Sequence, residues 1–148
     1  MMNSIFDVAN WFLTKERMTH KKLQKLCYYA QAWSYAIQPE PLTNAVFEAW
    51  VHGPVCRDLY NKYHCYGFDY LPSPEQAPTF DHATEDFLGS VWLTYGGNTA
   101  NALEALTHTE LPWQAARSGF APDEPSSKPI SPNIMRDFYR SIYIGGEE

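Results

Sequence analysis

Residues 19–37 read THKKLQKLCYYAQAWSYAI, and this stretch decides the fold. Thr19 is a good N-cap, and the prolines at 39 and 41 stop a helix, so the sequence predicts a helix from residue 19 to residue 37. Its main apolar stripe consists of Leu23, Leu26, Cys27, Ala30, Trp33 and Ile37. A second stripe consists of Tyr28, Ala32 and Tyr35. A helix that is apolar on nearly all sides should lie at the centre of the fold, with several neighbours packed around it.

The segments next to this helix predict a further helix on each side and one strand. Ser4 is a suitable N-cap for a helix that runs to about residue 14. Residues 45–51 are dense in β-branched and aromatic side chains and predict a short strand, which could pair with residues 68–71. Pro54 suits the first position of a third helix, expected from residue 54 to about residue 66.

The C-terminal half predicts more helices, separated by glycines and prolines. Asp81 or Thr84 begins a helix that ends at Gly96, and shorter helices are expected at 99–107 and after Pro112. Residues 121–132 contain four prolines and predict a loop, whereas 133–148 should form a last helix and a short tail, packed on the same domain as residues 1–120. The expected fold is mainly α: a compact bundle of about six helices around the buried helix at 19–37, with a minor β element.

Composition and charge argue against several function classes. The chain has 148 residues, 45% of them hydrophobic and 16% aromatic, which suits one domain with a dense core. Its formal net charge of -6 argues against binding to nucleic acid. The three cysteines have no paired spacing, and reduced thiols fit a cytoplasmic protein. We find no signal peptide and no apolar run near the ~20 residues that span a bilayer, so no membrane partner is expected.

Lys25 is the most unusual charged residue, because it lies one position before the apolar stripe of the central helix. An unpaired buried ammonium is costly, so Lys25 needs a carboxylate or a set of carbonyl groups. Glu48, on the expected strand, is the candidate partner. Such a pair could be a structural link between helix and strand, or it could belong to a binding cleft, where perturbed charges are common.

Trp50, His52, Gly53 and Pro54 form a corner between the expected strand and the third helix. A rigid corner with an aromatic ring and a histidine could contact a partner. Alternatively, the glycine and proline only make the turn, and the tryptophan fills the core.

Metal binding and catalysis find little support in the sequence. His52, Cys56, His64 and Cys65 lie close along the chain but lack the paired spacing of zinc sites, so no metal or cofactor is expected. A cysteine and a histidine could act as nucleophile and base, but no recognised catalytic motif is present, and buried cysteines are common fillers of cores. We therefore expect a protein without enzymatic activity.

Three motifs extend over about two-thirds of the chain. The first is LQKLCYYAQAW at 23–33, and the second is EAWVHGPV at 48–55, followed by Leu59-Tyr60 and Tyr63. The third joins Leu106-Thr107-His108 to Pro112-Trp113 and Ala116-Arg117. Together, in this order, they resemble the signatures of the Panacea domain, also called the SocA-like or GepA-like family.

This resemblance implies a compact, mainly helical fold and an antitoxin function. Family members are mostly antitoxins of bacterial and phage toxin–antitoxin pairs, and they neutralise diverse toxins by direct contact. We therefore expect a protein-binding domain whose partner is a toxin encoded by an adjacent gene. The alternatives are a proteolytic adaptor that delivers its partner to a protease, a Cys/His enzyme, and a nucleic-acid binder that regulates its own promoter.

The motifs also supply the candidate site residues. Those expected to contact a partner are Lys25, Tyr28, Gln31, Tyr35, Trp50, His52, Tyr60 and Tyr63. Those expected to hold the fold are Leu26, Ala30, Trp33, Glu48, Gly53, Pro54, His108 and Trp113. Exposed tyrosines are the preferred contacts, because a tyrosine ring buries a large surface and still offers a polar atom.

Overall fold

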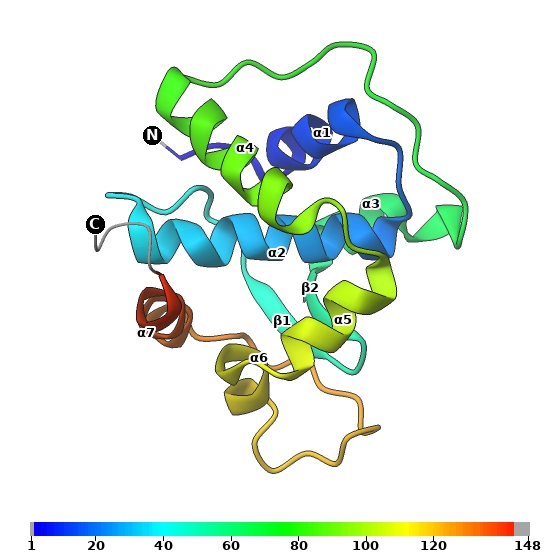
Figure 1. The fold of residues 1–148 in the computed structure, drawn as a ribbon. Helices are drawn as coiled ribbons and strands as arrows, with labels where there is room; N and C mark the ends of the chain where they lie inside the picture. The colour runs from blue at the N-terminus through cyan, green and yellow to red at the C-terminus, as the bar shows by residue number, and fades with distance from the viewer. Residues whose placement is uncertain (1, 144–148) are drawn as a thin grey trace.

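The centre of the molecule is the helix α2 (His20–Ile37), in a computed structural model that describes residues 2–143. α2 crosses the middle of the fold, with α1 (Ile5–Lys15) and α4 (His82–Tyr95) on one side and α6 (Leu111–Ala116) and α7 (Pro132–Ile142) on the other (Figure 1). Every residue from 23 to 32 is buried. The prediction of a central helix packed on nearly all sides is therefore confirmed.

Side-chain caps begin five of the helices, as the sequence predicts for most of them. Ser4, Thr19, Asp81, Thr99 and Ser131 each accept a hydrogen bond from a backbone N–H two or three residues further on, at 2.8–3.3 Å. These caps set the starts of α1, α2, α4, α5 (Ala100–His108) and α7.

Among residues 2–143 no helix is long and apolar enough to cross a membrane.

A two-stranded antiparallel hairpin packs against α2. It consists of β1 (Phe47–Trp50) and β2 (Gly53–Cys56), with Trp50 opposite Gly53, so that only two residues form the turn. The expected strand at 45–51 is thus present, but the expected pairing with residues 68–71 is wrong. The backbone N–H of Leu71 instead donates to the carbonyl oxygen of Met18 at 2.8 Å.

The third helix starts later than the sequence predicts. Pro54 lies in β2, opposite Ala49, and the chain becomes helical only in α3 (Arg57–Tyr63), followed by the short 3-10 helix η1 (His64–Tyr66). Gln24 explains the difference, because its side-chain amide accepts from the backbone N–H of Cys56 at 2.8 Å and donates to the Cys56 carbonyl at 2.9 Å. These two bonds hold residue 56 in an extended conformation.

The C-terminal helix α7 packs along α2 and buries Met135 and Tyr139 against it. The proline-rich segment before α7 follows the open side of β1. There Ala49 donates to the carbonyl of Lys128, and the backbone N–H of Ile130 donates to the carbonyl of Phe47, both at 2.8 Å. The last part of the expected 133–148 segment, residues 144–148, lies outside the described residues.

Candidate protein-interaction surface

The hairpin turn is fixed by a glycine that packs directly on the central helix. Gly53 has a φ of +109°, a conformation that side chains with a Cβ rarely adopt. A Cβ atom at this position would lie 2.6 Å from Cε of Lys25 and 3.2 Å from Oγ1 of Thr107. Glycine is therefore required here both by the turn and by the close approach of the hairpin to α2 and α5.

Lys25 lies beneath this turn and is only 2% exposed. Its Nζ donates a hydrogen bond to the carbonyl oxygen of Pro54 at 3.2 Å. Burial, reinforced by the charge of Lys21, lowers the pKa of Lys25 to about 7, against a smaller opposing effect of Glu104. The lysine of the motif at 23–33 is thus held by a backbone carbonyl of the motif at 48–55.

The expected pairing of Lys25 with Glu48 is wrong. The carboxylate of Glu48 accepts from Nε1 of Trp50 at 2.8 Å and from Nη2 of Arg57 at 2.9 Å. Successive residues of a strand point to opposite faces, so Glu48 and Trp50 share the outer face of β1, whereas Ala49 is fully buried. Glu48 therefore faces away from the central helix.

Aromatic rings gather on the outer side of the hairpin and α3. The ring centroids of Trp50 and Tyr60 are 4.9 Å apart, and His64 stacks on Tyr60 at 4.8 Å. The guanidinium of Arg57 lies 5.3 Å from the Trp50 ring, and His20 approaches Tyr60 edge-on at 6.1 Å. Tyr60 and Trp50 are half-buried, which leaves part of each ring open to a partner.

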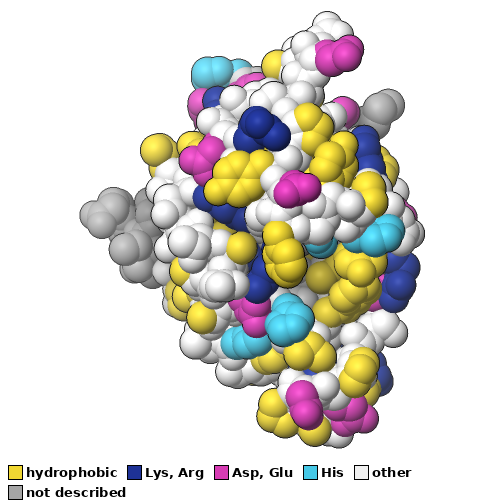
Figure 2. Space-filling model, turned by 90° about the vertical axis from the view of Figure 1, so that its right-hand side faces the viewer, with side chains coloured by type: hydrophobic (Ala, Val, Ile, Leu, Met, Phe, Trp, Pro, Cys, Tyr) yellow, Lys and Arg dark blue, Asp and Glu magenta, His cyan; other side chains and the backbone are white. Residues whose placement is uncertain are grey.

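The chain extends this surface into a loop with three exposed aromatic side chains. Tyr66 is 38% exposed, Phe68 is 96% exposed and Tyr70 is 61% exposed. Arg17 fixes the end of the loop by donating to the carbonyls of Tyr70 and Leu71, at 3.1 and 3.0 Å. We define the aromatic face as Trp50, Tyr60, His64, Tyr66, Phe68 and Tyr70. Figure 2 views the molecule from the side on which η1 lies in Figure 1 and shows clusters of hydrophobic side chains with histidines and cationic groups beside them.

A charged cluster lies beside the hairpin turn. Glu104 forms a salt bridge with Lys21, and its other oxygen lies 3.1 Å from Nδ1 of His52. Partial burial acts to raise the pKa of Glu104, but the hydrogen bonds from Lys21 and His52, together with their charges, outweigh it and lower the pKa. His52 itself is exposed, so a partner at the hairpin turn would contact it.

Comparison with known proteins identifies the chain's family. The family described as "Antitoxin SocA-like, Panacea domain" matches residues 23–114, more than half of the chain. The chain belongs to the Panacea domain family. It is 26% identical to Antitoxin SocA of Caulobacter vibrioides (strain NA1000 / CB15N) over 151 residues, which cover 90% of this chain and 80% of the relative. No solved structure matches it. Membership supports an antitoxin role in a toxin–antitoxin context, with a toxin as the implied partner.

The structure divides the eight expected contact residues of this Panacea domain into three groups: three beside the hairpin, one near the far end of α2 and four in the core. Trp50, His52 and Tyr60 reach the surface beside the hairpin, as expected for contacts. Tyr35 is half-buried near the far end of α2, where its hydroxyl accepts from Nε2 of Gln31 at 2.9 Å. Tyr35 therefore lies apart from the other three.

Four of the expected contact residues are buried, so their side chains are not open to a partner in this fold. They are Lys25, Tyr28, Gln31 and Tyr63. Each of the first three satisfies a polar group inside the protein; Gln31, for example, donates to the carbonyl of Thr43 at 2.9 Å and accepts from Oγ1 of Thr43 at 2.6 Å. Helical periodicity could not reveal that these side chains are buried, because an amphipathic side chain suits a core and an interface equally well.

The third Panacea motif supports the hairpin from below. Trp113 donates through Nε1 to the carbonyl of Trp50 at 2.9 Å, and its ring stacks on His108 at 4.0 Å. Burial lowers the pKa of His108, despite an opposing effect of Glu104, and Nε2 of His108 is buried without a hydrogen-bond partner among residues 2–143. This stack places the half-buried indole against the hairpin backbone, in a supporting position.

The loop residues of the aromatic face were missed by sequence reasoning, which assigned 68–71 to a strand. The signal that could have revealed them is the sequence Tyr66-Gly67-Phe68, since Gly67 ends the helical turn and leaves the following ring without a helix to pack against. Gly67 has a φ of +57°, which fits that interpretation. Large apolar side chains that are exposed together, as at this helix end, are typical of a contact surface.

The cysteines offer little nucleophilic chemistry in this arrangement. Cys27 and Cys56 are buried, and burial raises the pKa of both thiols, which disfavours the reactive thiolate. Cys65 is exposed in η1. Across residues 2–143, no three side chains of His, Cys, Asp or Glu are grouped so as to hold a metal ion.

Proposed function

We propose that this chain neutralises a toxin by direct protein–protein contact and that the aromatic face makes the contact. The observation that carries the proposal is Phe68, a large apolar side chain left 96% exposed in the loop that follows the packed rings of Trp50, Tyr60 and His64. Aromatic residues are enriched at protein interfaces and supply most of the binding energy where they are buried by a partner. Large apolar side chains exposed together on one surface mark interaction sites.

The support beneath the aromatic face favours binding without rearrangement. Gln24 clamps the backbone of Cys56 with two hydrogen bonds, and Trp113 holds the carbonyl of Trp50. A surface that is already ordered loses less conformational entropy when a partner binds, so more of the contact energy appears as affinity.

The contact we propose is blocking and not catalytic. The two buried thiols are held in their protonated form, and the charged cluster at Glu104 is engaged in its own salt bridge. A stable complex buries ~800 Å² on each partner, so the contact must extend beyond the six residues of the aromatic face. We place the contact in the cytoplasm, where three unpaired cysteines remain reduced.

The test is inhibition of the toxin by purified protein, using the product of the adjacent gene as the toxin. Phe68→Ala and Tyr60→Ala should each weaken the complex by about 30-fold or more, because truncation of an interface aromatic typically costs ~2 kcal/mol or more. Leu93→Ala is the matched control, since Leu93 is 86% exposed on α4, outside the aromatic face. Calorimetric titration measures each affinity, and thermal unfolding shows that the variants remain folded.

The purified system also separates blocking from delivery to a protease. Inhibition of the toxin by the two proteins alone supports direct neutralisation. A toxin that binds but stays active until a protease is added would contradict blocking and would assign the chain to the adaptor class. Equal affinity of Phe68→Ala, Tyr60→Ala and the unaltered chain would contradict the role of the aromatic face.

A further inference from the structure

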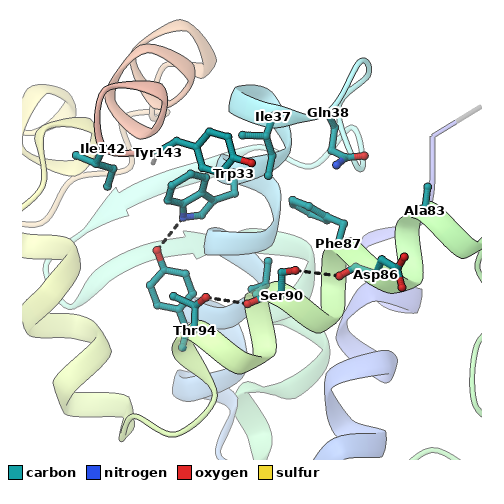
Figure 3. A pocket seen from close by; sticks show the side chains of 12 residues that line it. Trp33, Ile37, Gln38, Ala83, Asp86, Phe87, Ser90, Thr94, Ile142 and Tyr143 are labelled. Carbon is teal, nitrogen blue, oxygen red and sulfur yellow. Dashed lines mark hydrogen bonds between the residues drawn. The ribbon is translucent and has the colours of Figure 1, made fainter. Parts of the chain in front are cut away.

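A groove lies between α2, α4 and α7, at the opposite end of α2 from the hairpin turn (Figure 3). Its volume is about 730 Å³, within the ~300–1,000 Å³ typical of ligand-binding clefts. Phe87, Val91 and Tyr95 form a buried floor, whereas Ile142 at the edge is 46% exposed. Trp33 lies between floor and edge and is half-buried. The groove therefore offers an apolar surface that the chain does not cover with its own described residues.

The polar groups in the groove wall are mostly satisfied within the wall itself. Oγ of Ser90 donates to the carbonyl of Asp86 at 3.2 Å, and Oγ1 of Thr94 donates to the carbonyl of Ser90 at 2.8 Å. Nε1 of Trp33 donates to the hydroxyl of Tyr95 at 2.7 Å. Figure 3 shows these three bonds lying along the wall. An occupant would therefore be held mainly by apolar contact.

The charge at the groove selects the kind of occupant. None of the twelve lining residues is Lys, Arg or His, and the one carboxylate among them is that of Asp86, whose side chain is 72% exposed. Exposed His82 lies 3.3 Å from that carboxylate, and Arg140 donates to the Ala36 carbonyl, which offsets part of the negative end of α2. Because α2 and α7 both end at the groove, their C-terminal dipoles add further negative potential.

We propose that this groove binds an amphipathic helix of the toxin, whose apolar side chains lie on the floor and whose Lys or Arg lies beside Asp86. A helix laid in an apolar groove is a common mode of peptide recognition, with contacts at i, i+3, i+4 and i+7. The charge of the groove disfavours an acidic segment, and it disfavours a second copy of this chain, whose net charge is -6. The inference rests on the proposed antitoxin function and adds a second contact, separate from the aromatic face.

The first experiment uses designed peptides and the purified full chain. One peptide of about 14 residues carries leucines at i, i+3, i+4 and i+7 with lysines beside them, and its match carries glutamates in place of the lysines. Fluorescence anisotropy at low salt measures both affinities. The cationic peptide should bind at least ten-fold more tightly than the acidic one. Equal affinities would overturn the inference.

Two variants locate the binding site in the groove. Ser90→Trp fills the groove from an exposed position and should weaken the cationic peptide at least ten-fold, while Asp86→Lys should weaken it about five-fold. Ser127→Trp and Asp123→Lys make the same changes at exposed positions of the loop before α7 and should leave binding unchanged. Unchanged binding by Ser90→Trp contradicts the inference. The inference is also contradicted if the unaltered chain forms a dimer and Ser90→Trp abolishes that dimer. Such a result would assign the groove to a second copy of the chain.

The toxin itself then distinguishes failure of this inference from failure of the proposed function. If the adjacent gene product does not bind the unaltered chain, the antitoxin proposal fails. If the gene product binds the unaltered chain and Ser90→Trp with equal affinity, the antitoxin function stands and the groove inference fails. Loss of affinity in Ser90→Trp, with Ser127→Trp unchanged, supports the groove as a toxin contact.

Discussion

Two buried ionisable groups, Lys25 of α2 and Glu110 between α5 and α6, are satisfied in different ways. Lys25 donates to a backbone carbonyl of the hairpin, that of Pro54. Glu110, which is 7% exposed, accepts from the hydroxyls of Tyr29 and Tyr139 at 2.8 and 2.9 Å. Neither group has an oppositely charged partner in a salt bridge among residues 2–143.

The difference shows how each site can be disturbed. The acceptor for Lys25 is backbone, so it can be moved only by changing the turn that positions it. The donors to Glu110 are side chains, and Tyr139 comes from α7, outside residues 23–114 that match the family. The lysine site therefore depends on the geometry of the family's own motif, whereas the glutamate site depends on a helix added after that motif.

The largest effect is expected at the turn over Lys25. Gly53→Ala forces a Cβ into an unfavourable φ and into contact with Cε of Lys25, so it should lower the free energy of unfolding by about 3 kcal/mol or more. Gly97→Ala is the control, because a Cβ at Gly97 meets nothing within 4 Å. Urea unfolding followed by tryptophan fluorescence measures both. A change below about 1 kcal/mol for Gly53→Ala would show that the hairpin moves freely against α2.

Lys25 itself should destabilise the fold at neutral pH and below. Lys25→Met removes a buried amine and should raise the free energy of unfolding by about 2 kcal/mol at pH 6. The pKa of Lys25 falls from 10.5 to about 7 on folding, so the unfolded chain binds more protons between these values. The stability of the unaltered chain should therefore rise with pH from about 7 toward 10.5, and the advantage of the variant should shrink.

Urea unfolding at several pH values between 6 and 10 tests this pH dependence. Lys62→Met, at an exposed position, is the control, and its effect should be small at every pH. A variant less stable than the unaltered chain at pH 6 would mean that the ammonium is stabilised by more than the single carbonyl.

The glutamate site should be weakened by loss of one hydroxyl. Tyr139→Phe removes the hydrogen bond to Glu110 and the contact with the hydroxyl of Tyr28 at 3.1 Å, so it should cost about 1–3 kcal/mol. Tyr143→Phe is the control, because Tyr143 is 37% exposed. Thermal unfolding measures both, and an equal shift for the two variants would show that the hydroxyl network adds nothing to the attachment of α7.

The smallest effect is expected from Glu110. Its contribution to stability should fall as pH rises, whereas that of Lys25 should rise. Burial raises the pKa of Glu110, against the opposing effect of its hydrogen bonds with Tyr29 and Tyr139. A raised folded pKa stabilises the fold at pH below 4.5, and that contribution is lost as pH rises through the folded pKa. Relative to Glu110→Gln, the unaltered chain should therefore lose stability as pH rises from about 4.5 to neutrality. A difference that stays constant over this range would contradict the prediction.

The sequence predicted the position of Lys25 but not its partner. Helical spacing places residue 25 next to a buried stripe, so its burial could be inferred, but a backbone acceptor leaves no signature in the side chains. Glu110 was missed for a related reason, since it lies between two helices and belongs to no periodic pattern. The strand at 45–51 was predicted from its composition, whereas its pairing depends on a two-residue turn and on Gln24, which composition does not reveal.

The segment beside β1 determines how the hairpin can meet other chains. Arg117 is buried and donates to the carbonyls of Ala49, Ala121 and Glu124. Together with the backbone bonds from Ala49 to Lys128 and from Ile130 to Phe47, it keeps this segment against the strand. An uncovered strand edge is a template for aggregation and for strand addition by foreign peptides. Since this edge is already occupied, a partner cannot extend the hairpin from β1, and the chain is protected there from stacking into fibrils.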